Sequence, residues 1–136
     1  MTSQPISDLS ELLASLQPEL HPGTWAWCAL PTGTPLGDVD AVAIVHEVEG
    51  LTVVVAAADA RRRDWNVIFH SAWITLRVHS DLAAVGLTAA FASVLGDAGI
   101  SCNVIAGAYH DHLFVPVARA ADALAALQAL QTGSAA

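Results

Sequence analysis

Two histidines, His110 and His112, flank Asp111 in the segment YHDHLF and are the first candidates for chemistry in this sequence. Residues two apart on a β-strand point to the same face, so a strand here would present two imidazole nitrogens together, as metal sites require. His79 or His70 could supply a third ligand, but no carboxylate is identified on the same face. The pair fits either an incomplete metal site or two histidines that hydrogen-bond a nearby loop.

The turn from Ser80 to Leu87, SDLAAVGL, is a second candidate because a predicted strand passes into a predicted helix there. The first N–H groups of a helix lack intrahelical partners and carry a partial positive charge. The carboxylate of a free amino acid could therefore bind at the helix start, with its ammonium group on Asp81 or a backbone carbonyl. The same residues also fit a simpler interpretation, in which Gly86 permits a tight turn and Asp81 is solvated.

Other reactive side chains do not form a recognisable catalytic pattern. The sequence contains no GxSxG, phosphate-binding loop or HExxH motif, and no spacing pairs a nucleophile with its base. The cluster Arg61 to Arg63 fits either an anion site or the solvated side of a short helix. The sequence therefore predicts a protein that is not an enzyme and requires no cofactor; a metal-dependent enzyme that uses His110 and His112 is the alternative.

The segments around these candidates have the periodicity of strands and helices. From Trp73 to His79, apolar residues alternate with polar ones, which predicts a strand. A stripe at helical spacing begins at Leu87 and ends before Gly99, a residue suited to a left-handed C-terminal cap. The other predicted strands are Thr24 to Leu30, Ala41 to Val48, Leu51 to Ala56, Ser101 to Gly107 and Asp111 to Val117, and the other predicted helices are Ile6 to Leu16, Ala57 to Asp64 and Arg119 to Leu130.

This order predicts an α+β fold in two similar halves, divided near residue 70, with helices on one face of an antiparallel sheet. Neither half alone supplies every strand and helix of a βαββαβ unit. An open apolar edge invites pairing, so we expect strands to be shared between the halves or between subunits. The segment from Trp65 to Ala72 has no legible pattern.

Composition limits the possible partners. The 136-residue chain has a formal net charge of −8 and contains no lysine, whereas nucleic-acid binding requires a basic surface. Nucleic acid and anionic membrane surfaces are therefore not expected partners. The apolar runs are shorter than the ~20 residues that cross a bilayer, so we expect a cytoplasmic protein with Cys28 and Cys102 as small buried side chains.

Two long segments carry a family resemblance. VHSDLAAVGLTAAFASVLGDAGISCNV with AYHDHLFVPVARAADALAAL resembles the second half of small bacterial proteins built from tandem ACT domains, and ELHPGTWAWCALP with VEGLTVVV resembles their first half. The resemblance implies two ferredoxin-like βαββαβ units, at residues 1–70 and 71–136. It also implies a homodimer that binds a small molecule, most often an amino acid, as a regulatory or sensor protein.

In ACT domains, effectors bind at the interface of two units, beside the loop between the first strand and the first helix. Gly86 matches the glycine that commonly begins this helix. The resemblance therefore implies a ligand site formed by Ser80, Asp81, Val85, Gly86, Leu87 and, on an adjacent strand, Asn103. One departure is that no final strand follows Leu130, and a protein–protein interaction module without a ligand is an alternative function.

Overall fold

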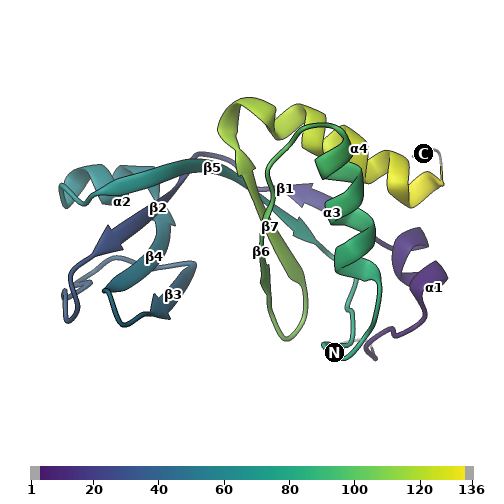
Figure 1. Cartoon of the computed structure of the whole chain (residues 1–136), viewed down its shortest axis with the longest axis horizontal. Coiled ribbons are helices and arrows are strands. Elements are labelled where there is room, and N and C mark those ends of the chain that lie inside the picture. The colour runs from purple at the N-terminus through teal and green to yellow at the C-terminus, as the bar shows by residue number, and fades with distance from the viewer. Residues whose placement is uncertain (1–3, 134–136) are drawn as a thin grey trace. The chain divides into compact units, whose positions relative to one another are not determined.

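A computed structural model describes residues 4–133 of the chain and divides it into two compact units (Figure 1). The central unit comprises Pro22–Ala72, and the terminal unit combines the residues up to His21 with those from Trp73 onward. The central unit contains β2 (Trp25–Leu30), β3 (Ala43–His46), β4 (Leu51–Ala56), α2 (Ala57–Arg62) and the first part of β5 (Val67–Leu76). The terminal unit contains α1 (Leu9–Ala14), β1 (Pro18–Leu20), the end of β5, α3 (Leu87–Asp97), β6 (Asn103–Ala106), β7 (Asp111–Pro116), the 3-10 turn η1 (Val117–Arg119) and α4 (Ala120–Thr132).

The terminal unit has the strand order β1-β5-β7-β6. Strand β1 pairs antiparallel with the end of β5, so that Pro18 faces Leu76 and Leu20 faces Ile74. In a βαββαβ unit that begins with β5, the strand expected after α4 would lie beside β5, and β1 fills that position from the other end of the chain. The predicted sharing of strands between the halves is therefore confirmed, and the apparent lack of a final strand is explained.

Alternation along β5 and β7 gives the terminal unit its core. Ile74, Leu76, Leu113 and Val115 are each fully buried, and α4 contacts β7, β1 and α3. The helices contribute a second set of fully buried side chains, namely Leu12, Phe91, Leu95, Ala123 and Leu127, and Leu16, which follows α1, is also fully buried. The helical stripes predicted from the sequence are thus the faces that the helices bury.

The central unit has the strand order β3-β4-β2-β5, with α2 between β4 and β5. Its core is formed by one face of β2 and β4, including Ala26, Cys28, Val53 and Val55, and by Ala60 of α2. No helix lies between β2 and β3; the loop there packs Leu36 and Val39 against the same core. The central unit is therefore a ferredoxin-like unit with a loop in the place of its first helix.

Several predicted boundaries change for local reasons. The first helix spans Leu9–Ala14, with Asp8 as N-cap accepting from the Glu11 N–H, and Ile6 instead forms an isolated bridge with Ser80. The illegible segment is the beginning of a ten-residue strand, β5, that ends at Leu76 rather than His79. The pattern of buried side chains changes partway along β5, because the first part of the strand belongs to the central unit and the last part to the terminal unit.

The α+β, ferredoxin-like fold class is confirmed. The division into family units at residues 1–70 and 71–136 stays a prediction, since the compact units group the N-terminal residues with the second half. Within residues 4–133, no helix has the length and apolar character needed to span a bilayer.

Candidate functional site

Helix α3 starts at Leu87, as predicted, and Gly86 is its N-cap. Gly86 has φ 103°, a left-handed conformation that strongly favours glycine. A Cβ atom at this position would lie 3.1 Å from Cδ2 of Leu9, which belongs to α1. The turn therefore favours glycine, and a larger residue would also displace the Leu9 side chain by a few tenths of an ångström.

A small cavity of about 70 Å³ lies beside this turn. Three of the six predicted ligand residues, Ser80, Asp81 and Leu87, line it. Gly86 and Val85 belong to the same turn but do not line the cavity, and Val85 is 85% exposed. The remaining lining residues are Leu82, Ala84, Thr88, Ala106 and Asp111.

Asn103, the weakest of the predicted ligand residues, lies apart from this cavity. It is the exposed first residue of β6 and pairs with Phe114 of β7. Its position on the strand was predicted correctly, whereas its role in binding stays a prediction.

The polar lining of the cavity is acidic. The Ser80 hydroxyl donates to Oδ2 of Asp111 at 3.3 Å. The Asp81 carboxylate accepts from the Ala83 N–H at 2.9 Å and from the Ser7 hydroxyl at 3.2 Å. No cationic side chain among the described residues lines the cavity, so its polar lining suits an ammonium group or another donor better than a carboxylate.

Asp111 also lines the cavity but was not among the predicted ligand residues. It is 7% exposed, and burial raises the pKa of its carboxyl group, against the opposing effects of the Ser80 hydrogen bond and the positive charge of His110. Its position between His110 and His112 could have identified it in the sequence, because side chains alternate along a strand and Asp111 therefore points to the face opposite the two histidines. The sequence analysis considered Asp111 only as the residue that separates the two histidines.

No third ligand joins the histidine pair among the residues that the structure describes. The residues from 4 to 133 contain no group of three or more His, Cys, Asp or Glu side chains that could hold a metal ion. His79 instead lies against the ring of Tyr109, with 5.5 Å between ring centroids. His70 belongs to the central unit, whereas His110 and His112 belong to the terminal unit.

His112 is part of a hydrogen-bonded chain in the terminal unit. Its Nδ1 atom accepts from Nε1–H of Trp73 at 3.2 Å and lies 3.0 Å from the Thr75 hydroxyl. Nε2 of His21 lies 2.7 Å from the same hydroxyl, and the His21 ring stacks on Trp73 at 3.6 Å. Since Trp73 can only donate, Nδ1 of His112 is unprotonated and its imidazole is neutral.

Burial favours the same neutral state. The pKa of His112 is lowered mainly by desolvation and further by the charges of His110, His21 and Arg77. Desolvation likewise lowers the pKa of His21, against the raising effect of Glu19. His21 and His112 are thus joined in a neutral network through Trp73 and Thr75 of β5, rather than through a loop as the sequence suggested for the histidine pair.

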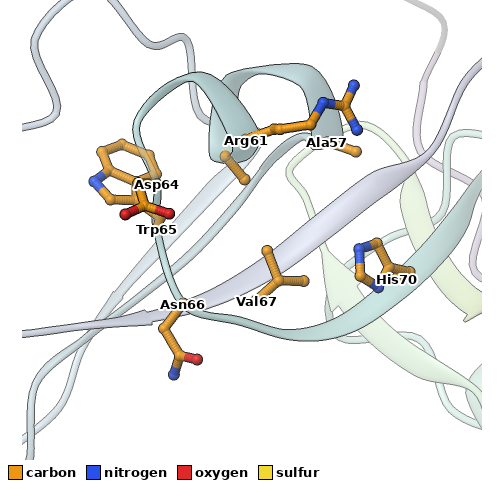
Figure 2. Close-up of a pocket in the computed structure, with 8 residues that line it drawn as sticks. Ala57, Arg61, Asp64, Trp65, Asn66, Val67 and His70 are labelled. Atoms are coloured by element: carbon orange, nitrogen blue, oxygen red, sulfur yellow. The ribbon is translucent and has the colours of Figure 1, made fainter.

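The central unit contains a larger pocket, of about 480 Å³, that was not predicted (Figure 2). It lies between α2 and β5 and is lined by Ala57, Ala60, Arg61, Asp64, Trp65, Asn66, Val67 and His70. The arginine cluster and the polar loop around Asp64 were visible in the sequence. Their relation to His70 was not, because the segment that connects them had no legible pattern.

Comparison with known proteins identifies the family. Residues 4–72 match one model described as an ACT domain, and residues 69–129 match a second. The chain belongs to the ACT-domain family. The resemblance noted in the sequence, including the tandem arrangement, is thereby confirmed. ACT domains in general have regulatory, non-catalytic roles and bind small molecules such as amino acids.

Solved structures of similar fold support the same assignment. A protein from Vibrio cholerae, described as of unknown function and as a possible transport protein, is 44% identical, with a TM-score of 0.80 and coverage of 90% of this chain and 95% of that chain. A protein from Agrobacterium tumefaciens is 18% identical, with a TM-score of 0.67 and coverage of 84% and 87%. The regulatory subunit of aspartate kinase from Thermus flavus is 10% identical, with a TM-score of 0.57 and coverage of 83% and 95%. No curated protein matches the chain.

Proposed function

We propose that this ACT-domain protein is a non-catalytic, cytoplasmic regulatory or sensor protein that binds an amino acid at an interface between ACT units. The observation that carries the proposal is the tandem match to ACT domains over residues 4–72 and 69–129. The aspartate kinase regulatory subunit has the same fold. The two free cysteines are consistent with a reducing compartment.

The Gly86 turn, with Ser80, Asp81, Val85, Leu87 and the neighbouring Asn103, is the proposed ligand site. Its cavity of about 70 Å³ is smaller than the roughly 300–1,000 Å³ of typical ligand pockets. A ligand of amino-acid size would therefore need a second ACT unit to close over it. The acidic floor supports a location for the ammonium group at Asp81 and Asp111, and the free N–H groups at the start of α3 support one for the carboxylate.

Exposed apolar side chains at this turn support a homodimer as the source of the second unit. Leu82 is 67% exposed and Val85 is 85% exposed, and both lie in the turn that precedes α3. Exposed apolar side chains that cluster beside a cavity commonly mark an interaction surface. Burying them against another copy of the chain would enlarge the site and remove apolar surface from water.

A thermal-shift titration with each of the twenty amino acids at millimolar concentration tests the ligand. At least one should raise the unfolding temperature, because a ligand that binds only the folded state stabilises it. Asp81→Asn should abolish that rise, whereas Asp97→Asn, which removes an exposed carboxylate at the other end of α3, should preserve it. Absence of any ligand-dependent shift would reject the proposal and favour an interaction module without a ligand.

Sedimentation equilibrium tests the interface separately. Val85→Asp should shift a dimer towards monomer, because it places a charge in the proposed apolar contact. Val48→Asp is the matched control, since Val48 is 98% exposed and lies in the central unit. An effect from Val48→Asp but not from Val85→Asp would place the dimer contact elsewhere.

A further inference from the structure

The pocket between α2 and β5 is bounded by charges of opposite sign. Arg61 and Asp64 both line it, together with the polar side chains Asn66 and His70. Figure 2 shows the Arg61 guanidinium and the His70 ring towards one side of the pocket, and the Asp64 carboxylate beside Trp65 towards the other. The pocket therefore has a cationic, donor-rich side and an anionic side, with an apolar wall from Ala57, Ala60 and Val67.

Arg61 differs from every other cationic side chain in the protein. The chain contains five arginines and no lysine, against 13 carboxylates. Arg62 and Arg63 pair with Asp38, Arg77 pairs with Glu19, and Arg119 pairs with Asp122. Arg61 alone forms no ion pair with a carboxylate of residues 4–133, a range that contains all 13. Among residues 4–133, the arginine without a carboxylate partner thus lines the 480 Å³ pocket of an acidic protein.

A β-bulge brings His70 to this pocket. Phe69 pairs with Trp27 of β2 and Val67 pairs with Cys28, so Ile68 is an extra residue in β5. Residues three apart on a regular strand face opposite sides, but the extra residue reverses the alternation. Val67 and His70, whose partners Cys28 and Ala26 are both buried, consequently share one face of the sheet, and both line the pocket, where the His70 side chain stays exposed.

Asp64 is held at the opposite side by an unusual backbone conformation. It has φ 54°, one of two non-glycine residues with positive φ among those described. The turn begins where α2 ends at Arg62 and is closed by the Trp65 N–H, which donates to the Ala60 carbonyl at 2.9 Å. Aspartate tolerates this conformation better than most residues, so a carboxylate can remain where the turn requires positive φ.

We propose that this pocket is a second binding site, for a small organic carboxylate whose other end carries an ammonium group. Arg61 binds the carboxylate with two parallel N–H donors, and His70 supplies a further donor. Asp64 accepts from the ammonium group, and Val67 with the two alanines contacts the methylene chain between the charged ends. The site lies wholly within the central unit and does not depend on a ligand at the Gly86 turn.

A titration of the ¹⁵N-labelled full-length protein with 5-aminopentanoate, followed through backbone amide shifts, tests the inference. Pentanoate and pentylamine each lack one charged end and serve as matched probes. The shifts should centre on residues 57–70, and 5-aminopentanoate should bind about tenfold or more tightly than either probe, because each charged contact contributes about one order of magnitude in affinity.

Two variants assign the ends of the ligand. Arg61→Gln should lower affinity for 5-aminopentanoate and pentanoate by about tenfold or more, whereas Arg62→Gln makes the same charge change on the same helix and should not. Asp64→Asn should remove the preference for 5-aminopentanoate over pentanoate, since asparagine keeps the backbone conformation. If Arg61→Gln fails to fold, Arg61→Lys keeps the charge but loses the paired donors and should still weaken binding.

Each contrary outcome overturns the inference. Shifts centred on residues 80–88 would move the ligand to the Gly86 turn and would support the proposed function instead. Equal losses in Arg61→Gln and Arg62→Gln would show that net charge alone drives binding. Equal affinity for 5-aminopentanoate and pentanoate would remove Asp64 from the site, and absence of shifts in residues 57–70 would exclude binding there.

Discussion

The two units join a strand to a helix in different ways, and only one junction contains a large pocket. At the Gly86 turn, a left-handed glycine allows α1 to approach closely, and the enclosed space is about 70 Å³. At the junction of α2 with β5, a left-handed aspartate and a bulge open about 480 Å³. Tight packing at the start of α3 therefore leaves little space at the Gly86 turn, whereas the bulged strand leaves a larger pocket beside α2.

The charged side chains that line the two junctions differ in sign. Within residues 4–133, the cavity at the Gly86 turn is lined by Asp81 and Asp111 and by no cationic side chain, whereas the central pocket is lined by Arg61, which forms no ion pair there. A carboxylate ligand is thus favoured within the central unit and needs the helix N–H groups or a second unit at the Gly86 turn. The start of a helix that resembles a ligand site is therefore not by itself a complete one.

The largest effect is expected from Gly86→Ala. Alanine at φ 103° is strained, and its Cβ would lie 3.1 Å from the Leu9 side chain, so the free energy of unfolding should fall by about 2 kcal/mol. Chemical denaturation measures the change. Gly96→Ala is the control, because Gly96 lies inside α3 with open space around its Cβ position and should stabilise by about 0.5–1 kcal/mol. Equal effects at both positions would mean that the turn does not constrain the terminal unit.

A pH effect should distinguish the terminal unit from the central one. His21 and His112 have lowered pKa values in the folded state, so below the ordinary value of 6.5 the unfolded chain binds more protons than the folded one. The stability of the fold should therefore be unaffected by these groups above pH 6.5 and should decrease as the pH falls below it. Thermal unfolding across this range measures the slope.

His112→Gln should reduce that slope, because it removes one of the two titrating groups. His46→Gln, which changes an exposed histidine of β3 in the central unit, should leave it unchanged. An unchanged slope in His112→Gln would show that the neutral network does not govern the acid sensitivity.

A smaller effect is expected from Asp64→Gly. Glycine adopts φ 54° without strain, so unfolding stability should change by less than about 1 kcal/mol, in the stabilising direction. Denaturation midpoints measure this change. Marked destabilisation would indicate that the Asp64 side chain holds the turn, rather than the backbone alone.

The smallest effect is expected from Arg61→Gln in the absence of ligand. Because Arg61 forms no ion pair within residues 4–133, unfolding stability should change by less than about 0.5 kcal/mol. A loss well above this in denaturant unfolding would assign Arg61 to the fold rather than to the pocket.

Local patterns in the sequence predicted much of the fold. The extent of β4 and the start of α3 at Leu87 are as predicted, because alternation and helical stripes are properties of contiguous residues. Strand β1 was missed because three residues beginning with proline have no pattern of their own and are defined only by pairing with β5. The start of β5 was missed because a bulge at Ile68 breaks its alternation.

The candidate sites divide in the same way. The tight glycine turn before α3 and the ACT-domain resemblance could be predicted from the sequence, since both depend on residue type and local spacing. Only the tertiary structure placed Asp111 beside Ser80, joined His112 to His21 through Thr75, and turned His70 towards the pocket of Arg61. These relations depend on strand pairing and on a bulge, which bring together residues that no local pattern connects.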